Sequence, residues 1–198
     1  MKKLLKRIGI CLVLAASVWC GSLLADRQRL NDELIRFHVV ANSDSEEDQS
    51  IKLQVRDAVL NSLQSDLNKI ADVNEARAYL QAKLPQIQAV ANSVLEATGC
   101  DCEAVVTLCK EAFDTRYYDT FTLPAGIYEA LRITIGEGEG HNWWCVLYPN
   151  LCFMDSVHAI VPKEGKEELR SVLTDEEYAM IVKGTPVKIK WFFLQLTE

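Results

Sequence analysis

The sequence predicts an α+β fold with a largely antiparallel sheet and with helices mainly from the N-terminal half. Between residues 44 and 99, apolar residues recur every three to four positions, which is typical of amphipathic helices. After residue 101, short runs alternate with period two and are separated by turns rich in Gly, Pro, Asn and Asp. Strands that follow one another in this way favour antiparallel pairing over a doubly wound parallel sheet.

Size and charge indicate one globular domain behind a short leader. The 198 residues are 49% hydrophobic and 25% charged, which suits a single core that needs no metal or disulfide to fold. Residues 1–25 hold four of the 21 basic residues and none of the 28 acidic ones, so the remainder carries 17 − 28 = −11. An acidic body argues against nucleic-acid binding and against docking of the domain itself on an anionic membrane.

The leader predicts export. A basic head, Lys2 to Arg7, precedes an uncharged, mostly apolar run from Ile8 to Ala25, which is typical of a signal peptide or an N-terminal membrane anchor. Leu23 is bulky for a cleavage site, and about 18 residues is short for a membrane span. Both alternatives for residues 1–25 therefore stay open, and residues 26–198 are expected to form a single extracytoplasmic α+β domain that meets the membrane only through its leader.

A strand and a helix open the domain. Residues 35–41 alternate as a strand does, and the polar run 42–45 ends it. Ser43 followed by Glu46 has the capping-box pattern, and a helix to about residue 68 is expected from there. The turn between strand and helix either binds an anion or only caps the helix.

A second helix is predicted to begin near Asn74 and to end at Gly99 as a C-cap. Pro85 lies in its middle, so we expect either one kinked helix or two short ones.

The second half predicts mostly strands. Two short helices are also expected, over residues 163–173 and 174–182, and Thr174 with Glu177 forms a capping box for the second. The predicted strands cover residues 102–113, 127–135, 143–148, 156–161 and 187–196, with a short strand or an ordered loop at 117–121.

The run from Leu123 to Phe153 predicts a hairpin. Gly136, Gly138 and Gly140 occupy every second position of the segment between its two strands. Glycine permits sharp bends and a close approach of the backbone to a partner. Their spacing is not the G-x-G-x-x-G of a dinucleotide site.

Acidic and imidazole groups in this hairpin suggest three possible chemistries. Carboxylates and an imidazole together bind metals or move protons. The candidates are a thiol hydrolase of Cys145 and His141, a wall glycosidase using Glu137 and Glu139, and a metal site made by these acids, His141 and either His38 or His158. Against the thiol hydrolase, residues four apart on a strand lie ~13 Å apart. Against the metal site, the sequence has no H-E-x-x-H spacing. Against the glycosidase, two acids at a Gly-rich tip are typical of a solvated turn. We therefore predict no catalytic residue, no cofactor and no metal.

The seven cysteines include five in the body, an odd number that cannot all pair within one chain. Cys145 and Cys152 flank a Pro-Asn turn, so either a disulfide or two free buried thiols fits them. Cys100 and Cys102 lack the C-x-x-C spacing of a zinc site.

Two long blocks carry a family resemblance. LPAGIYEALRI with GEGEGHNWWCVLYPNLC, and LIRFHVVANSDSEEDQSIKLQVRDAVL (Leu34–Leu60), closely resemble stage II sporulation protein R of endospore-forming Firmicutes. The resemblance implies a signalling protein rather than an enzyme. It implies synthesis in the forespore, export into the space between forespore and mother cell, and activation there of the mother cell's membrane-embedded aspartic protease, which matures pro-sigma-E.

The expected partner contacts lie on the glycine-rich loop and just after it. Aromatic residues often dominate interface energy, and successive strand residues point to opposite faces, so we expect one tryptophan to be buried and the other to be available. The candidates are Glu137, Glu139, His141, Asn142, Trp143 and Trp144. Two alternatives are a secreted hydrolase acting on cell wall or peptide through Glu137, Glu139, His141 and Cys145, and a scaffold protein of an envelope complex.

Overall fold

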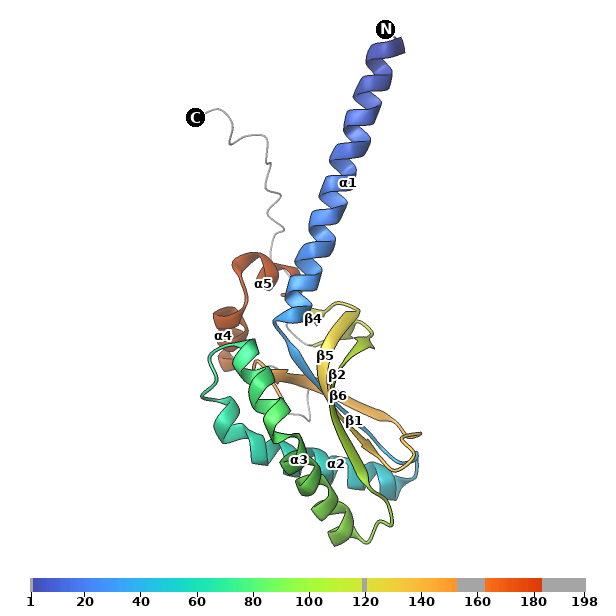
Figure 1. Ribbon diagram of the computed structural model, residues 1–198, viewed down its shortest axis with the longest axis vertical. Helices are drawn as coiled ribbons and strands as arrows, with labels where there is room; N and C mark the ends of the chain where they lie inside the picture. The colour runs from blue at the N-terminus through green and yellow to red at the C-terminus, as the bar shows by residue number, and fades with distance from the viewer. Residues whose placement is uncertain (1, 119–120, 153–162, 183–198) are drawn as a thin grey trace.

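The computed structural model describes residues 2–118, 121–152 and 163–182 as an α+β fold (Figure 1). The predicted strands over 156–161 and 187–196 lie outside these residues. The elements, in chain order, are α1 (Lys2–Asp32), β1 (Ile35–Val40), α2 (Glu46–Leu67), α3 (Val73–Thr98), β2 (Ala104–Phe113), β3 (Arg116–Tyr117), β4 (Thr122–Leu123), β5 (Gly126–Ile135), β6 (Asn142–Tyr148), α4 (Lys163–Val172) and α5 (Asp175–Ile181).

The main sheet is mixed, so the prediction of a largely antiparallel sheet is wrong. Its strand order is β2-β5-β1-β6. The β2–β5 and β1–β6 pairs are antiparallel, but β1 and β5 run parallel through the whole length of β1. Parallel strands require a long crossover connection, and α2 and α3, which follow β1 directly, form most of it here.

The predicted hairpin is also wrong, because β1 lies between β5 and β6. All six residues of β1 are buried, as is typical of an interior strand. The segment of residues 136–141, which we call the glycine loop, therefore crosses the end of β1 instead of making a tight turn. The amides of Glu139 and Gly140 donate to the carbonyls of Asn42 and Ala41, over 3.1 and 3.0 Å.

Helices α2 and α3 cover one face of the sheet (Figure 1). Leu131 and Ile133 are fully buried there, as their alternation predicts, whereas Ile127 remains 55% exposed at the start of β5. The strand side chains in this core include Ile35, Phe37, Val39, Ala104, Val106, Leu131, Ile133, Ile135, Cys145 and Leu147.

Among the residues that the structure describes, only half of the opposite face is covered. A second core forms there beneath the end of α1, the β3–β4 pair and the helices α4 and α5. Its members include Leu30, Leu34, Phe113, Phe121, Leu123, Tyr128, Ala130, Val146, Leu169, Leu173 and Ile181. The other half, near the glycine loop, is open to solvent, as the exposure of Val105 shows at 56%.

The helix ends partly match the prediction. Gly99 closes α3 in the left-handed conformation, and Thr174 with Glu177 forms the expected capping box of α5. The N-caps of α2 and α3 are Ser45 and Asp72 rather than Ser43 and Asn74.

Pro85 lies inside α3, which is a single helix. Of the two alternatives that the sequence left open at this position, the division into two short helices is therefore wrong.

The described residues of the predicted leader belong to α1, which projects from the body (Figure 1). Its far part exposes apolar side chains, with Leu12 at 66% and Val18 at 74%, whereas Leu30 is fully buried against the sheet. Across the described part of the chain, no helix combines the length and apolar character needed to cross a membrane.

Candidate partner-binding surface

His141 anchors the glycine loop to the turn between β1 and α2 through contacts with Asp44. Its backbone amide donates to Oδ1 of Asp44 over 2.6 Å, and its ring Nδ1 contacts the same oxygen. Nζ of Lys52 donates to the carbonyl of His141 over 2.9 Å. Because these contacts engage the ring and both backbone groups of His141, they hold the loop in one position while the imidazole stays exposed.

The turn after β1 is a capped helix start. The side chains of Ser43 and Asn42 donate to Oδ2 of Asp48 over 2.5 and 3.0 Å, and these bonds hold the pKa of Asp48 below its usual value of 3.8. Since Asp48 already accepts from both side chains, the capping alternative fits this turn better than an anion site.

The Asp44–His141 contact has a testable pH dependence. Hydrogen bonds from the His141 side chain and backbone lower the pKa of Asp44 from its usual 3.8. A carboxyl with a lowered folded-state pKa stabilises the fold above its unfolded value, and that contribution is lost as the pH falls through the lower folded value. We expect His141→Ala to move the pKa of Asp44 back towards 3.8. A carboxyl-carbon NMR titration measures it, and an unchanged pKa would rule out the contact.

Gly140 is predicted to be intolerant of any side chain. It is buried, and an added Cβ would overlap the backbone carbonyl of Ser43. Because backbone must then move, we expect Gly140→Ala to destabilise the protein by about 1–3 kcal/mol. Glu139→Ala, an exposed neighbour, is the control and should change stability by less than about 0.5 kcal/mol. Equal melting temperatures for the two variants would contradict this packing.

Beside the glycine loop lies the open sheet patch, which we define as Val105, Thr107, Arg132, Thr134, Asn142 and Trp144. The register places Thr107 opposite Arg132, Arg132 opposite His38, and His38 opposite Trp144. These residues therefore share one face and form a row across all four strands. All six patch residues are half-buried or exposed.

A polar network runs beneath the patch and centres on His38, which is only 8% exposed. Its Nδ1 lies 2.8 Å from Oε1 of Glu111, and its Nε2 lies 2.8 Å from Oδ1 of Asn142. An ionised carboxylate only accepts, so Nδ1 is the donor to Glu111. Arg132 Nη1 lies 3.5 Å from the other oxygen of Glu111. The network thus links β1, β2, β5 and β6.

The small side chain of Ala130 leaves space for this network. On the face shared with His38 and Glu111, it occupies the β5 position between Tyr128, which pairs with Glu111, and Arg132, which pairs with His38. Its small, fully buried side chain lets the two residues meet across β5.

The two tryptophans lie on opposite faces, as expected, but both are half-buried. Trp144 stacks on His38 with ring centroids 5.6 Å apart, and the guanidinium of Arg116 lies 3.8 Å from the Trp144 ring centroid. Trp143 makes an edge contact with Phe37 on the helix-covered face and carries Arg56 over its ring. Trp144 therefore belongs to the open sheet patch, and Trp143 does not.

The remaining sequence candidates are spread out. Glu137 and Glu139 are exposed on the glycine loop. Cys145 forms a disulfide with Cys152, so it is not a free thiol. In the part of the chain that the structure describes, no three His, Cys, Asp or Glu residues are grouped so that they could hold a metal ion.

Glu111, Arg116 and Arg132 were missed in the sequence. Each meets partners distant along the chain, for example Glu111 and His38, which are 73 positions apart. The available signal was the position of Glu111 in the strand predicted over 102–113, where a charged residue at an alternate position is typical of a solvent-facing side chain.

The fold and this surface define an α+β protein with one sheet face half open beside an anchored loop. The sequence model of the family "Stage II sporulation protein R (spore_II_R)" matches residues 31–158. The chain belongs to this family. It is 40% identical over 159 residues to "Stage II sporulation protein R" of Bacillus subtilis (strain 168), an alignment that covers 80% of this chain and 71% of that protein. No solved structure matches the chain significantly.

Proposed function

We propose that this chain is an exported signalling protein of sporulation that passes from the forespore into the space between forespore and mother cell. There it activates the mother cell's membrane-embedded aspartic protease that matures pro-sigma-E. The family match over residues 31–158 carries the proposal, since it spans the main sheet, the glycine loop and the open sheet patch.

The proposed mechanism is contact. The glycine loop and the open sheet patch dock on the extracytoplasmic side of the protease and favour its active arrangement, because a ligand shifts an equilibrium through its higher affinity for one state. Trp144 with Arg116 stacked on it is the candidate anchor, since tryptophan and arginine are enriched among residues that dominate binding energy.

The first helix supports the proposed export. Its basic head and exposed apolar side chains, such as Leu12 and Val18, have the character of a signal peptide or an anchor. In the proposal the head stays in the forespore cytoplasm and the body crosses the membrane.

No observation favours the rival, a secreted hydrolase. It would use Cys145 as its nucleophile, but a nucleophilic cysteine acts as a thiolate and Cys145 is joined to Cys152. Glu137 and Glu139 lie exposed on the loop, whereas the general acid of a glycosidase is typically sheltered from solvent.

Coexpression tests the proposed function. The full chain is produced with the protease and pro-sigma-E in a host that has no other sporulation proteins. We expect maturation only when the chain is exported. A version without residues 1–25, which stays in the cytoplasm, is the control, and equal maturation with that version would overturn the proposal.

A further inference from the structure

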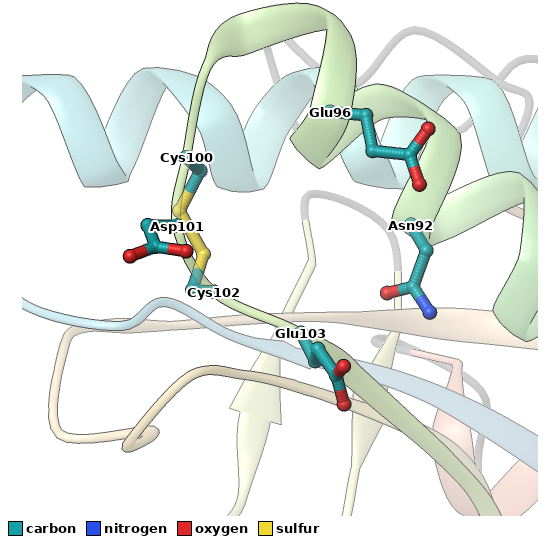
Figure 2. Close-up of a pocket in the computed structure, with 6 residues that line it drawn as sticks. All are labelled: Asn92, Glu96, Cys100, Asp101, Cys102 and Glu103. Atoms are coloured by element: carbon teal, nitrogen blue, oxygen red, sulfur yellow. A yellow bond between two sulfur atoms is a disulfide. The ribbon is translucent and has the colours of Figure 1, made fainter.

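The Cys100–Cys102 disulfide lies on the connection between α3 and β2 and lines a cavity of about 460 Å³ (Figure 2). The remaining lining residues are Asn92, Glu96, Asp101 and Glu103. Both cysteines are half-buried, and Asp101 between them is exposed. A reagent that enters the cavity therefore meets the disulfide directly.

The backbone around these cysteines is held independently of the disulfide. Cys100 N donates to the carbonyl of Leu95 over 3.0 Å in the C-cap of α3. Ala104 N donates to Oδ1 of Asn92 over 2.8 Å, and Gly136 N donates to the carbonyl of Glu103 over 2.9 Å. With both ends of the connection fixed, breaking the S–S bond would leave the two sulfurs near each other and ready to re-form it.

The second disulfide is more deeply buried and joins cysteines that are farther apart in the sequence. Cys145 and Cys152 are 8% and 6% exposed, and they are seven positions apart. They join β6 to the segment after it, and Cys152 packs against the core through its contact with the Val146 carbonyl. The Cys100–Cys102 bond closes only a two-residue separation, so it removes less freedom from the unfolded chain. Its position suits reactivity better than stabilisation.

We propose that Cys100–Cys102 is a thiol–disulfide exchange site. An external thiolate attacks one of the two sulfurs, the S–S bond breaks, and a mixed disulfide forms while the other cysteine leaves as a thiolate. A second external thiol then attacks the mixed disulfide. The protein gains two electrons and two protons as a dithiol, and the two external thiols leave as one disulfide. The reverse sequence, with an external disulfide, re-forms the bond.

The acidic side chains that line the cavity favour reactants with a positive charge. Glu96, Asp101 and Glu103 line the same cavity without a basic residue among its lining groups. Negative charges repel an anionic thiol and attract a cationic one, and this effect falls with salt. The site is therefore assigned to thiols or disulfides that carry positive charge beside the sulfur, such as cysteine within a basic peptide.

The test compares two thiols on the full-length native chain after its free thiols have been blocked by alkylation. Cysteamine is cationic and 2-mercaptoethanesulfonate is anionic, and both are used at equal thiolate concentrations. Newly exposed cysteines are alkylated with a second reagent and assigned by peptide mass. We expect Cys100 and Cys102 to react in the folded protein while Cys145 and Cys152 stay protected until denaturant is added.

The rate with cysteamine should exceed that with the sulfonate by about tenfold at low salt, and the ratio should approach one near 1 M salt. Glu103→Gln should lower the ratio, and Glu47→Gln, exposed on α2, should leave it unchanged. Equal protection of both disulfides in the folded protein would overturn the exchange site. A ratio near one at low salt would overturn the selection by charge.

A double variant, Cys100→Ser with Cys102→Ser, separates exchange from folding. Because hydrogen bonds hold the connection, this variant should fold, and its melting temperature should fall less than that of Cys145→Ser with Cys152→Ser. A loss as large as in the buried pair would assign Cys100–Cys102 a structural role instead and overturn the proposal.

Discussion

Thr107→Trp is expected to lower activation of the protease about 100-fold while leaving the domain folded. Thr107 is exposed in the middle of β2 and lies opposite Arg132 in the open sheet patch. Tryptophan is well tolerated on strands, so the change adds a large side chain where the partner is proposed to dock. Losing a central contact costs about 2.7 kcal/mol or more, which lowers activation about 100-fold.

The matched control is Ala89→Trp, which adds the same side chain on the exposed side of α3. Both variants should keep a melting temperature within about 2 °C of the parent, since surface changes seldom exceed 0.5 kcal/mol. Pro-sigma-E maturation in the coexpression host provides the activity readout. Full activity of the Thr107 variant would remove the open sheet patch from the interface.

Glu111→Ala should give a large loss of stability. The Glu111 side chain is 16% exposed, and its two oxygens face His38 Nδ1 and Arg132 Nη1. Removing it leaves the Nδ1 donor of His38, a residue that is only 8% exposed, without its partner. Because an unsatisfied buried donor costs about 1–3 kcal/mol, and more when a charge is involved, we expect a loss of about 2–3 kcal/mol.

Thermal unfolding measures this effect, which corresponds to a drop of about 5–10 °C for a chain of this size. Glu111→Gln retains an acceptor for His38 and should lose less. Lys110→Ala, on the other face of the same strand, is the control, because Lys110 is exposed and its ion pair with Asp32 spans 3.6 Å. A Glu111→Ala protein as stable as the Lys110→Ala protein would contradict the network.

Local patterns predicted most helices and strands because their causes lie within a few residues. The alternation over 127–135 and the Thr174–Glu177 capping box depend on neighbours along the chain. The order of the strands does not. The sequence between β5 and β6 has the glycines of a hairpin, and only the burial of all six β1 residues explains why that strand lies between them.

The candidate site was predictable in part for the same reason. Glu137 to Trp144 form one continuous segment with distinctive residue types, so the sequence identified them together. The contacts that place them come from distant parts of the sequence. His141 contacts Asp44, 97 positions away, and His38, which lies beneath the open sheet patch, contacts Glu111, 73 positions away. Such pairs arise from the order of the strands in the sheet, which no local pattern specifies.

The most direct test of action by contact is the dose dependence of the protease. Purified full-length chain is titrated into membranes that contain the protease and pro-sigma-E, and the maturation rate is followed over time. If the chain acts by contact, the maturation rate is set by the dose at once, stays constant in time and saturates at a fixed ratio of chain to protease. The contrary result is a trace dose of chain with which the maturation rate keeps rising until it reaches the same maximum. That result would show that the chain modifies its target by turnover, and it would contradict action by contact.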